Sequence, residues 1–241
     1  MTAETFTREA QERLKQYLSR PGYIIPIGLG DKEAAGSVAA INLAISGTLT
    51  DDIPECMSQV IGKWVINVQD RMPEELRNSE RWKTALVYAA GTGRDYEDER
   101  FDMLVRWMWT TVLPSVQPTA DKHGFGEQWR HMCDTRTEAA TRNLYRVIFK
   151  RCGNPTRRIG QYDFPEDAFE AAYAAVNAAD VARAKVKDDI NVELSYISAM
   201  AFTLSHVIDA SNDPNIWERF NPPGLLEHLV WYKAIGRVVY A

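Results

Sequence analysis

Apolar residues along the chain recur mostly at intervals of three and four positions, which is the spacing of one face of an α-helix. A clear example is the stripe formed by Phe101, Leu104, Val105, Met108 and Val112. Runs in which apolar and polar residues alternate strictly, as in a half-buried strand, are missing from the sequence. The pattern therefore predicts an all-α protein, an irregular multi-helix bundle of roughly nine helices with little or no sheet.

Capping residues, prolines and glycines divide the pattern into separate helices. The expected helices are Thr7–Ser19, Asp31–Ser46, Asp52–Asp70, Ser79–Ala90, Asp95–Val112, Glu127–Lys150, Pro165–Lys187, Ile190–Ala210 and a last one after Pro222 and Pro223. The segment Cys152–Asp167 holds two glycines and two prolines and is the expected internal boundary. We therefore expect helical domains over 1–152 and 165–241. One continuous domain with a linker at 153–164 remains the alternative.

A glycine-rich turn, IPIGLGDKEAAGSVAAINLA, precedes the second expected helix. It resembles a phosphate-binding loop, but Glu33 stands where the dinucleotide fingerprint has its third glycine. Asp31 and Glu33 also place negative charge where a phosphate would have to bind. We therefore interpret Asp31 as the N-cap of a structural helix.

The charge pattern singles out one basic segment in a chain of net charge −5. The net charge argues against binding of nucleic acid or acidic membranes by the whole surface. Arg142, Arg146 and Lys150, spaced four apart, form one helical stripe, and Arg157 and Arg158 follow it. These five residues are candidates for binding a polyanion or an acidic partner. The alternative is an ordinary solvated face with Glu138 and Arg142 as a helical ion pair.

Two further residues stand out on the helical wheels. Arg136 falls among Trp129, Met132 and Val147, so we expect a buried guanidinium that needs a structural or a ligand partner. Trp107 points away from the apolar stripe of its helix. Either a second helix covers it, or it is an exposed interface anchor.

The histidines and acidic residues fit structural roles. We expect His123 at a helix end, His131 in a solvated pair with Glu127, His206 on the surface and His228 at the edge of the core. The acidic run Asp95–Asp102 is expected to be a solvated helix start. The three cysteines lack zinc-ligand spacing and are expected to be free thiols in a reducing cytosol. No known catalytic motif, cofactor motif or metal site is found.

The two ends of the sequence also carry predictions. The first residues are charged and contain no apolar segment of the kind a secretory signal has. No run is long and apolar enough for a membrane span. Near the other end, Leu225, Leu229, Tyr232, Gly236 and Val239 share a helical stripe. We expect this helix, Leu225–Val239, to be docked among other helices or buried in a homo-oligomer interface.

The segment GLGDKEAAGSVAAINLAISGTLTDDIPECMSQVIGKWVINVQDRMPEELRNS, with AAGTGR and GFGEQWRHMC after it, resembles a group of uncharacterised proteins encoded by bacteriophages and bacterial mobile elements. The resemblance covers residues 20–135. It implies a small accessory protein in the cytoplasm of a bacterial host, of a kind that often binds host defence machinery such as CRISPR complexes. It implies no activity and no site residues.

Three hypotheses about function follow. The first is a non-catalytic interaction protein, such as a counter-defence protein, that binds a host protein or ribonucleoprotein. The basic stripe and Trp107 motivate it. The second is a protein that binds a small molecule or nucleotide, with Arg136 in the site. The third is an enzyme of unrecognised type, which ranks last because no acid–base or nucleophile set can be assembled.

Overall fold

The computed structural model describes residues 6–152, 165–184 and 190–238, with only the backbone described for 190–193 and 233–238. Helices make up most of this part of the chain, and it contains no strand. Gly30 and Ala35 form an isolated β-bridge there. The expected all-α class is therefore confirmed, and the number of helices is close to the nine expected.

The chain forms two compact units, residues 1–100 with 221–241 and residues 101–220. The division lies inside one helix and between two others, and not at the expected boundary, 153–164, which is outside the described residues. The expected domains 1–152 and 165–241 thus do not coincide with these units. Helices on both sides of the expected boundary belong to the same unit.

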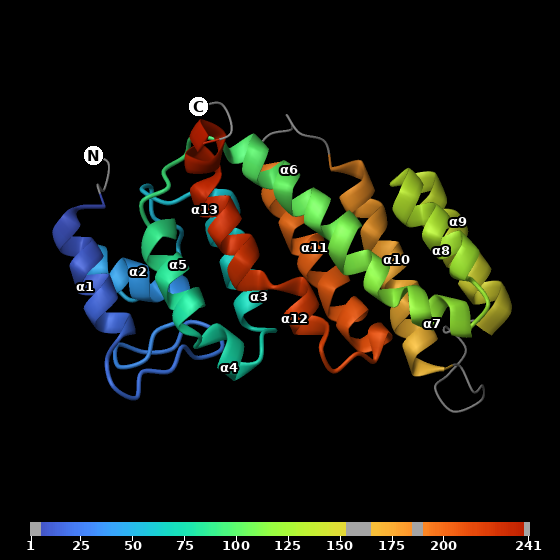
Figure 1. The fold of residues 1–241 in the computed structure, drawn as a ribbon, viewed down its shortest axis with the longest axis horizontal. Coiled ribbons are helices and arrows are strands. Elements are labelled where there is room, and N and C mark those ends of the chain that lie inside the picture. The colour runs from blue at the N-terminus through green and yellow to red at the C-terminus, as the bar shows by residue number, and fades with distance from the viewer. Residues whose placement is uncertain (1–5, 153–164, 185–189, 239–241) are drawn as a thin grey trace. The chain divides into compact units, whose positions relative to one another are not determined.

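In the described part of the chain, the first unit contains helices from both ends of the sequence, which Figure 1 colours blue to green and red. They are α1 (Arg8–Leu18), α2 (Ser37–Ser46), α3 (Gln59–Gln69), α4 (Glu74–Arg77), α5 (Glu80–Ala89), the start of α6 (Glu97–Trp107), and α13 (Pro222–Val238). The core of this unit contains side chains that are almost fully buried, namely Leu14, Leu18, Ile25, Ile41, Met57, Ile61, Trp82, Leu86, Leu226 and Leu229. Because Leu226 and Leu229 belong to α13, which packs on α3 and α5, the expected docking of this helix is confirmed for its leucines. Tyr232, a member of the expected apolar stripe, is in contrast 38% exposed.

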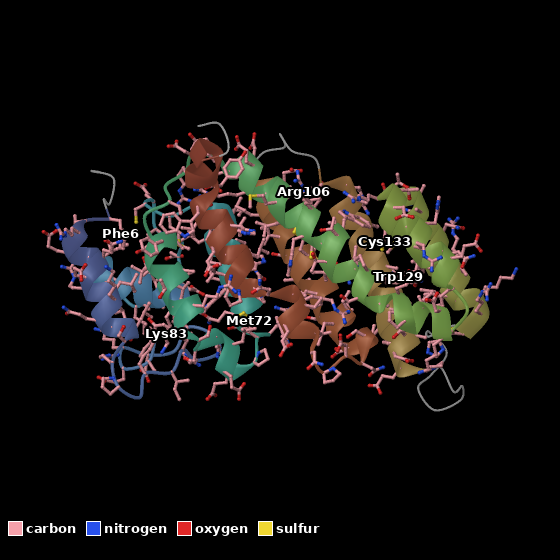
Figure 2. All side chains as sticks on the ribbon, viewed as in Figure 1. Phe6, Met72, Lys83, Arg106, Trp129 and Cys133 are labelled. Atoms are coloured by element: carbon pink, nitrogen blue, oxygen red, sulfur yellow. The ribbon has the colours of Figure 1, made fainter. Side chains whose placement is uncertain are left out.

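The second unit contains α6 from Phe101 onward and the helices that follow it as far as Phe220. They are the π-helix η1 (Met108–Val112), the 3₁₀-helix η2 (Leu113–Val116), α7 (Gln117–Lys122), α8 (Gly126–Thr135), α9 (Glu138–Cys152), α10 (Glu166–Arg183), α11 (Ile190–Ser211) and α12 (Ile216–Phe220). Trp129, labelled in Figure 2, is fully buried, and its indole Nε1 donates to the carbonyl of Leu113 at 2.9 Å. This bond ties α8 to η2.

Alanines explain how α10 lies between α9 and α11. Six of them are completely buried: Ala168, Ala171, Ala172, Ala174, Ala175 and Ala178. Side chains this small let the backbones of neighbouring helices approach closely, while alanine itself favours the helix. Figure 1 shows α9, α10 and α11 side by side in this order.

Two helix starts differ from those expected. Helix α2 begins at Ser37, not Asp31, and the Ser37 amide donates to the side chain of Gln69 at 2.7 Å. Asp31 instead accepts the amides of Glu33 and Ala34, both at 2.8 Å, within the preceding loop. Similarly, α3 begins at Gln59 rather than Asp52 because Ser58 supplies the N-cap. An aspartate side chain accepts backbone amides in a loop turn as readily as at a helix start, so the sequence alone misplaced both starts.

Two long helices that the sequence predicts are interrupted. The expected helix Glu127–Lys150 breaks at Arg136, whose φ of 55° is left-handed. The Thr137 hydroxyl then accepts the amide of Ala140 at 3.3 Å and starts α9. The expected helix Asp95–Val112 is α-helical only to Trp107, after which the π- and 3₁₀-helical turns accommodate Pro114. Proline cannot donate the backbone hydrogen bond that a continuous α-helix needs there.

Candidate functional site

The basic stripe lies on the solvent side of α9. Ala140, Thr141, Leu144 and Ile148 bury the opposite side of the helix, so Arg142, Arg146 and Lys150 are exposed together. Their four-residue spacing places successive side chains one helical turn apart, about 6 Å along the axis. Arg157 and Arg158, the other two members of the expected basic surface, lie outside the described residues.

A groove runs beside this stripe, between α9 and α10, with a volume of about 450 Å³. We call it the α9/α10 groove. Its lining residues are Thr141, Arg142, Tyr145, Arg146, Ala175, Val176, Ala179, Asp180 and Arg183. The two helices run antiparallel, because Glu138 at the start of α9 contacts Arg183 at the end of α10. Small residues of α10 give the groove its depth, and arginines of both helices stand along it.

Ion pairs gather at one end of the groove. The Glu138 carboxylate accepts a hydrogen bond from Arg142, and it also forms an ion pair with Arg183 at 3.3 Å. Arg183 pairs in addition with Asp180 at 3.0 Å. Arg146, in contrast, has no hydrogen-bond or ion-pair partner among the residues described. The expected Glu138–Arg142 pair is thus confirmed, and Arg146 leaves a positive charge exposed on the groove wall.

Tyr145, Val176 and two alanines supply the apolar part of the groove, and further aromatic side chains lie on the same two helices. Tyr145 packs against Phe149 one turn later on α9, with the rings tilted and their centroids 4.1 Å apart. On α10, Tyr173 and Val176 are 38% and 40% exposed although they are apolar. Burial raises the pKa of Tyr145, and Tyr173 adds to this effect. The Tyr145 phenol therefore stays neutral and able to donate a hydrogen bond.

Trp107, a candidate anchor, is not exposed. Its side chain is 8% accessible, and its indole Nε1 donates to the carbonyl of Phe220 at 3.1 Å. Its ring also meets the Phe220 ring edge-on, with centroids 6.0 Å apart. Of the two alternatives from the sequence, cover by a second helix is the one observed, and Trp107 is withdrawn from the partner surface.

Arg136 is also placed differently from the expectation. The left-handed turn at this position ends α8 and turns the side chain into solvent, where its Nε lies 3.4 Å from the Cys133 carbonyl. The expected burial assumed one continuous helix through 127–150, and it is wrong because that helix is broken. A buried ligand site around Arg136 therefore has no support.

A charged cluster joins α7 to the start of α10. Asp167, which is 9% exposed, accepts hydrogen bonds from His123 Nε2 at 2.9 Å and from Lys122 Nζ at 2.8 Å. Burial opposes ionisation of Asp167, but these hydrogen bonds and the adjacent charges outweigh it and lower its pKa. The expected place of His123 at a helix end is confirmed. Its partner Asp167 was not predicted.

The other site-like groups have structural contacts. His206, expected on the surface, is half-buried and pairs with Glu170 at 2.5 Å. His228, expected at the core edge, is exposed. Burial raises the pKa of the Cys133 thiol to about 12, which keeps it protonated. In the described ranges, no three or more His, Cys, Asp or Glu side chains come together as a metal site would require.

The sequence identified one wall of the groove and missed the other. Arg142 and Arg146 were candidates, whereas Val176, Asp180 and Arg183 of α10 were not. The sequence does contain a signal for the apolar side chains of the groove region. Tyr173 and Val176 interrupt the alanines of α10 at helical spacing, and Tyr145 and Phe149 are spaced four apart beside the arginine stripe of α9. The pairing of α9 with α10 is needed to bring these residues together.

Comparisons with protein-family models, curated proteins and solved structures find no match to this chain. Of the helices that the structure describes, none combines the length and the apolar character needed to cross a lipid bilayer.

Proposed function

We propose that this chain is an interaction protein of phage or mobile-element type that binds an acidic surface of a host protein or ribonucleoprotein through the α9/α10 groove. A counter-defence role in the bacterial cytoplasm is the context that the sequence resemblance suggests. The single observation behind the proposal is that exposed arginines and the exposed apolar side chain of Val176 line one groove.

Arginine chemistry favours binding over catalysis in this groove. A guanidinium keeps its proton at all physiological pH values, so it attracts carboxylates or phosphates and does not exchange protons with them. Exposed Val176 and half-buried Tyr145 add apolar area that a partner can cover. Arg146 has no ion pair with another described residue that would have to be broken before it contacts an acidic partner.

A second candidate is binding of a small anionic molecule such as a nucleotide. The observation that favours it is the volume of the groove, since about 450 Å³ lies within the range of ligand pockets. The candidate site is now the groove, because Arg136 is exposed elsewhere. A thermal-shift screen with nucleotides tests this candidate, since a ligand that binds the folded state raises the melting temperature.

The main test compares three forms of the full chain as bait in host lysate. They are the wild type, the R142E/R146E variant, and a control with the same charge change, R8E/K32E, on exposed residues of the other unit. We expect the R142E/R146E variant to capture about tenfold less partner, or less still, than the wild type does. This difference should grow as the salt concentration falls, because salt screens the charges. Equal capture by all three forms, or equal loss in the control, would refute the proposal.

A further inference from the structure

We infer that the α9/α10 groove binds one acidic amphipathic α-helix of a partner protein. This inference rests on the proposed function and narrows it from an acidic surface to a particular secondary structure. It follows from the shape of the groove, the spacing of its arginines and the position of its carboxylates.

The shape of the groove suits a helix. Two antiparallel helices in contact leave a seam, and a third helix can lie in that seam with its apolar side down. Here the lining residues of α10 extend from Ala175 to Arg183, about 12 Å along the axis, which equals about two turns of a bound helix. Ala175 and Ala179 are small enough for the bound helix to approach, and Val176 supplies an exposed apolar contact.

The apolar surface continues beyond the groove along the same helix pair. Tyr145 and Phe149 form a ring pair on α9, and Phe169 and Tyr173 form one on α10, with centroids 4.7 Å apart in the second pair. Leucines or similar residues of a partner helix, repeated at intervals of three and four, would cover such a surface. An extended strand would place alternate side chains in solvent and cover less of it.

The arginine spacing matches a helical ligand as well. Arg142 and Arg146 are one turn apart on α9, and both lie on the groove wall. Carboxylates four residues apart on a partner helix have the same spacing of about 6 Å. A partner helix that runs along α9 can therefore pair both arginines at once, with acidic residues on one flank of its apolar stripe.

The carboxylates of the groove argue against a nucleic-acid ligand. Glu138 and Asp180 stand at one end, among the arginines, so a continuous phosphate backbone would meet negative charge there. A protein helix avoids this repulsion because only some of its side chains are acidic. Val176 and the alanines also offer no donor to a phosphate, whereas apolar side chains of a helix gain from their burial.

The test uses the full chain and synthetic peptides of about 18 residues, long enough for the two turns and their flanks. One peptide has leucines at positions i, i+3, i+4 and i+7 and glutamates on one flank. A second has the same composition in scrambled order, and a third carries a central proline that breaks the helix. A single-stranded RNA of similar charge is the fourth probe. Fluorescence anisotropy gives each dissociation constant.

We expect the helical peptide to bind at least about tenfold more tightly than the scrambled and proline peptides, with a gain of helix signal in circular dichroism. The variant Arg146→Glu should weaken it, whereas R8E/K32E should not. Val176→Arg gives the sharpest outcome. It should weaken helix binding, because it removes apolar contact, but strengthen RNA binding, because it adds positive charge.

The outcomes separate the inference from the proposed function. Three outcomes would show that the helix inference is wrong while the proposed function survives. In the first, all acidic peptides bind equally, and in the second, RNA binds best. In the third, the helical peptide fails to bind although R142E/R146E still loses its lysate partner. If R142E/R146E binds both the peptides and the lysate partner as the wild type does, the helix inference and the proposed function are both wrong. Circular dichroism and melting temperature of each variant verify that it remains folded.

Discussion

Glu97 shows how one side chain can determine a helix start that lies far away in the sequence. Its carboxylate accepts the Ser58 hydroxyl at 2.8 Å and the amides of Gln59 and Val60 at 2.9 and 3.0 Å. These amides belong to the first turn of α3, where no backbone acceptor is available to them. The acidic run that the sequence marks as a solvated helix start thus contains one residue that caps another helix.

We predict that Glu97→Ala lowers the free energy of unfolding by about 2–3 kcal/mol, because it removes charge-assisted hydrogen bonds and leaves the α3 amides without an acceptor. Urea denaturation measures the change. The matched control is Asp98→Ala, which removes the same charge from the next residue, an exposed one. If both variants lose the same stability, the charge of the run matters and the cap does not.

Asp167 gives a prediction about pH. Its folded pKa lies below the ordinary 3.8, because the hydrogen bonds from Lys122 and His123 outweigh the effect of burial. A carboxyl with a lowered folded pKa stabilises the protein above its unfolded pKa, and this contribution is lost as pH falls through the folded value. Asp167→Asn should therefore cost about 1–3 kcal/mol at pH 7 and progressively less below about pH 4.

Urea denaturation of both proteins between pH 3 and pH 7 checks this behaviour. A gap between wild type and Asp167→Asn that stays constant over the whole range would contradict it, since the ionised carboxylate would then play no part.

At the scale of elements, the break between α8 and α9 decides where the basic stripe points. Arg136 has a left-handed backbone with a φ of 55°, a conformation that costs a residue with a side chain about 1 kcal/mol and costs glycine little. We predict that Arg136→Gly raises the free energy of unfolding by about 0.5–1 kcal/mol, and therefore raises the melting temperature slightly. Calorimetry measures the shift.

The sign of this effect distinguishes two structures. In one continuous helix over 127–150, the same substitution would destabilise the protein, because glycine is a poor helix former. Arg136→Val serves as the opposite control, since a branched side chain tolerates the left-handed turn worst.

The sequence predicted helices where their signals are local. Thr7 and Ser19 flank α1 as expected, and the Ser79 hydroxyl accepts the amide of Trp82 at the start of α5. It failed where distant groups decide. Gln69 receives the first amide of α2, and Glu97 those of α3, although both lie more than 30 residues away along the chain. Such caps appear only when the tertiary structure is known.

At the scale of the whole molecule, α13 completes a unit that begins at the other end of the sequence. Leu225, Leu226 and Leu229 are buried in the first unit. Trp231 is 42% exposed, and its ring packs at a tilt against Tyr88 with centroids 4.9 Å apart. The sequence predicted that this helix is enclosed, because apolar residues surround most of it. It did not predict the partner helices α3 and α5, since contacts so distant in sequence leave no local pattern.

We predict that Leu229→Ala destabilises the first unit by about 2–5 kcal/mol, the usual cost of a cavity at a fully buried leucine. Hydrogen exchange should show the loss of protection in α3 and α5, which pack on α13. The neighbouring His228→Ala is the control, because His228 is exposed. Equal effects of the two variants would mean that α13 is not docked as described.

The discontinuity of the first unit also has a consequence for synthesis on the ribosome. Residues 1–100 emerge first, but the helix that covers their core follows only after residues 101–220 have been made. At elongation rates of about 5–20 residues per second, these 120 residues take about 6–24 s. During that interval the second unit is still being synthesised, and the apolar surface under α13 is uncovered. The nascent chain therefore presents a binding site for chaperones that the finished protein conceals.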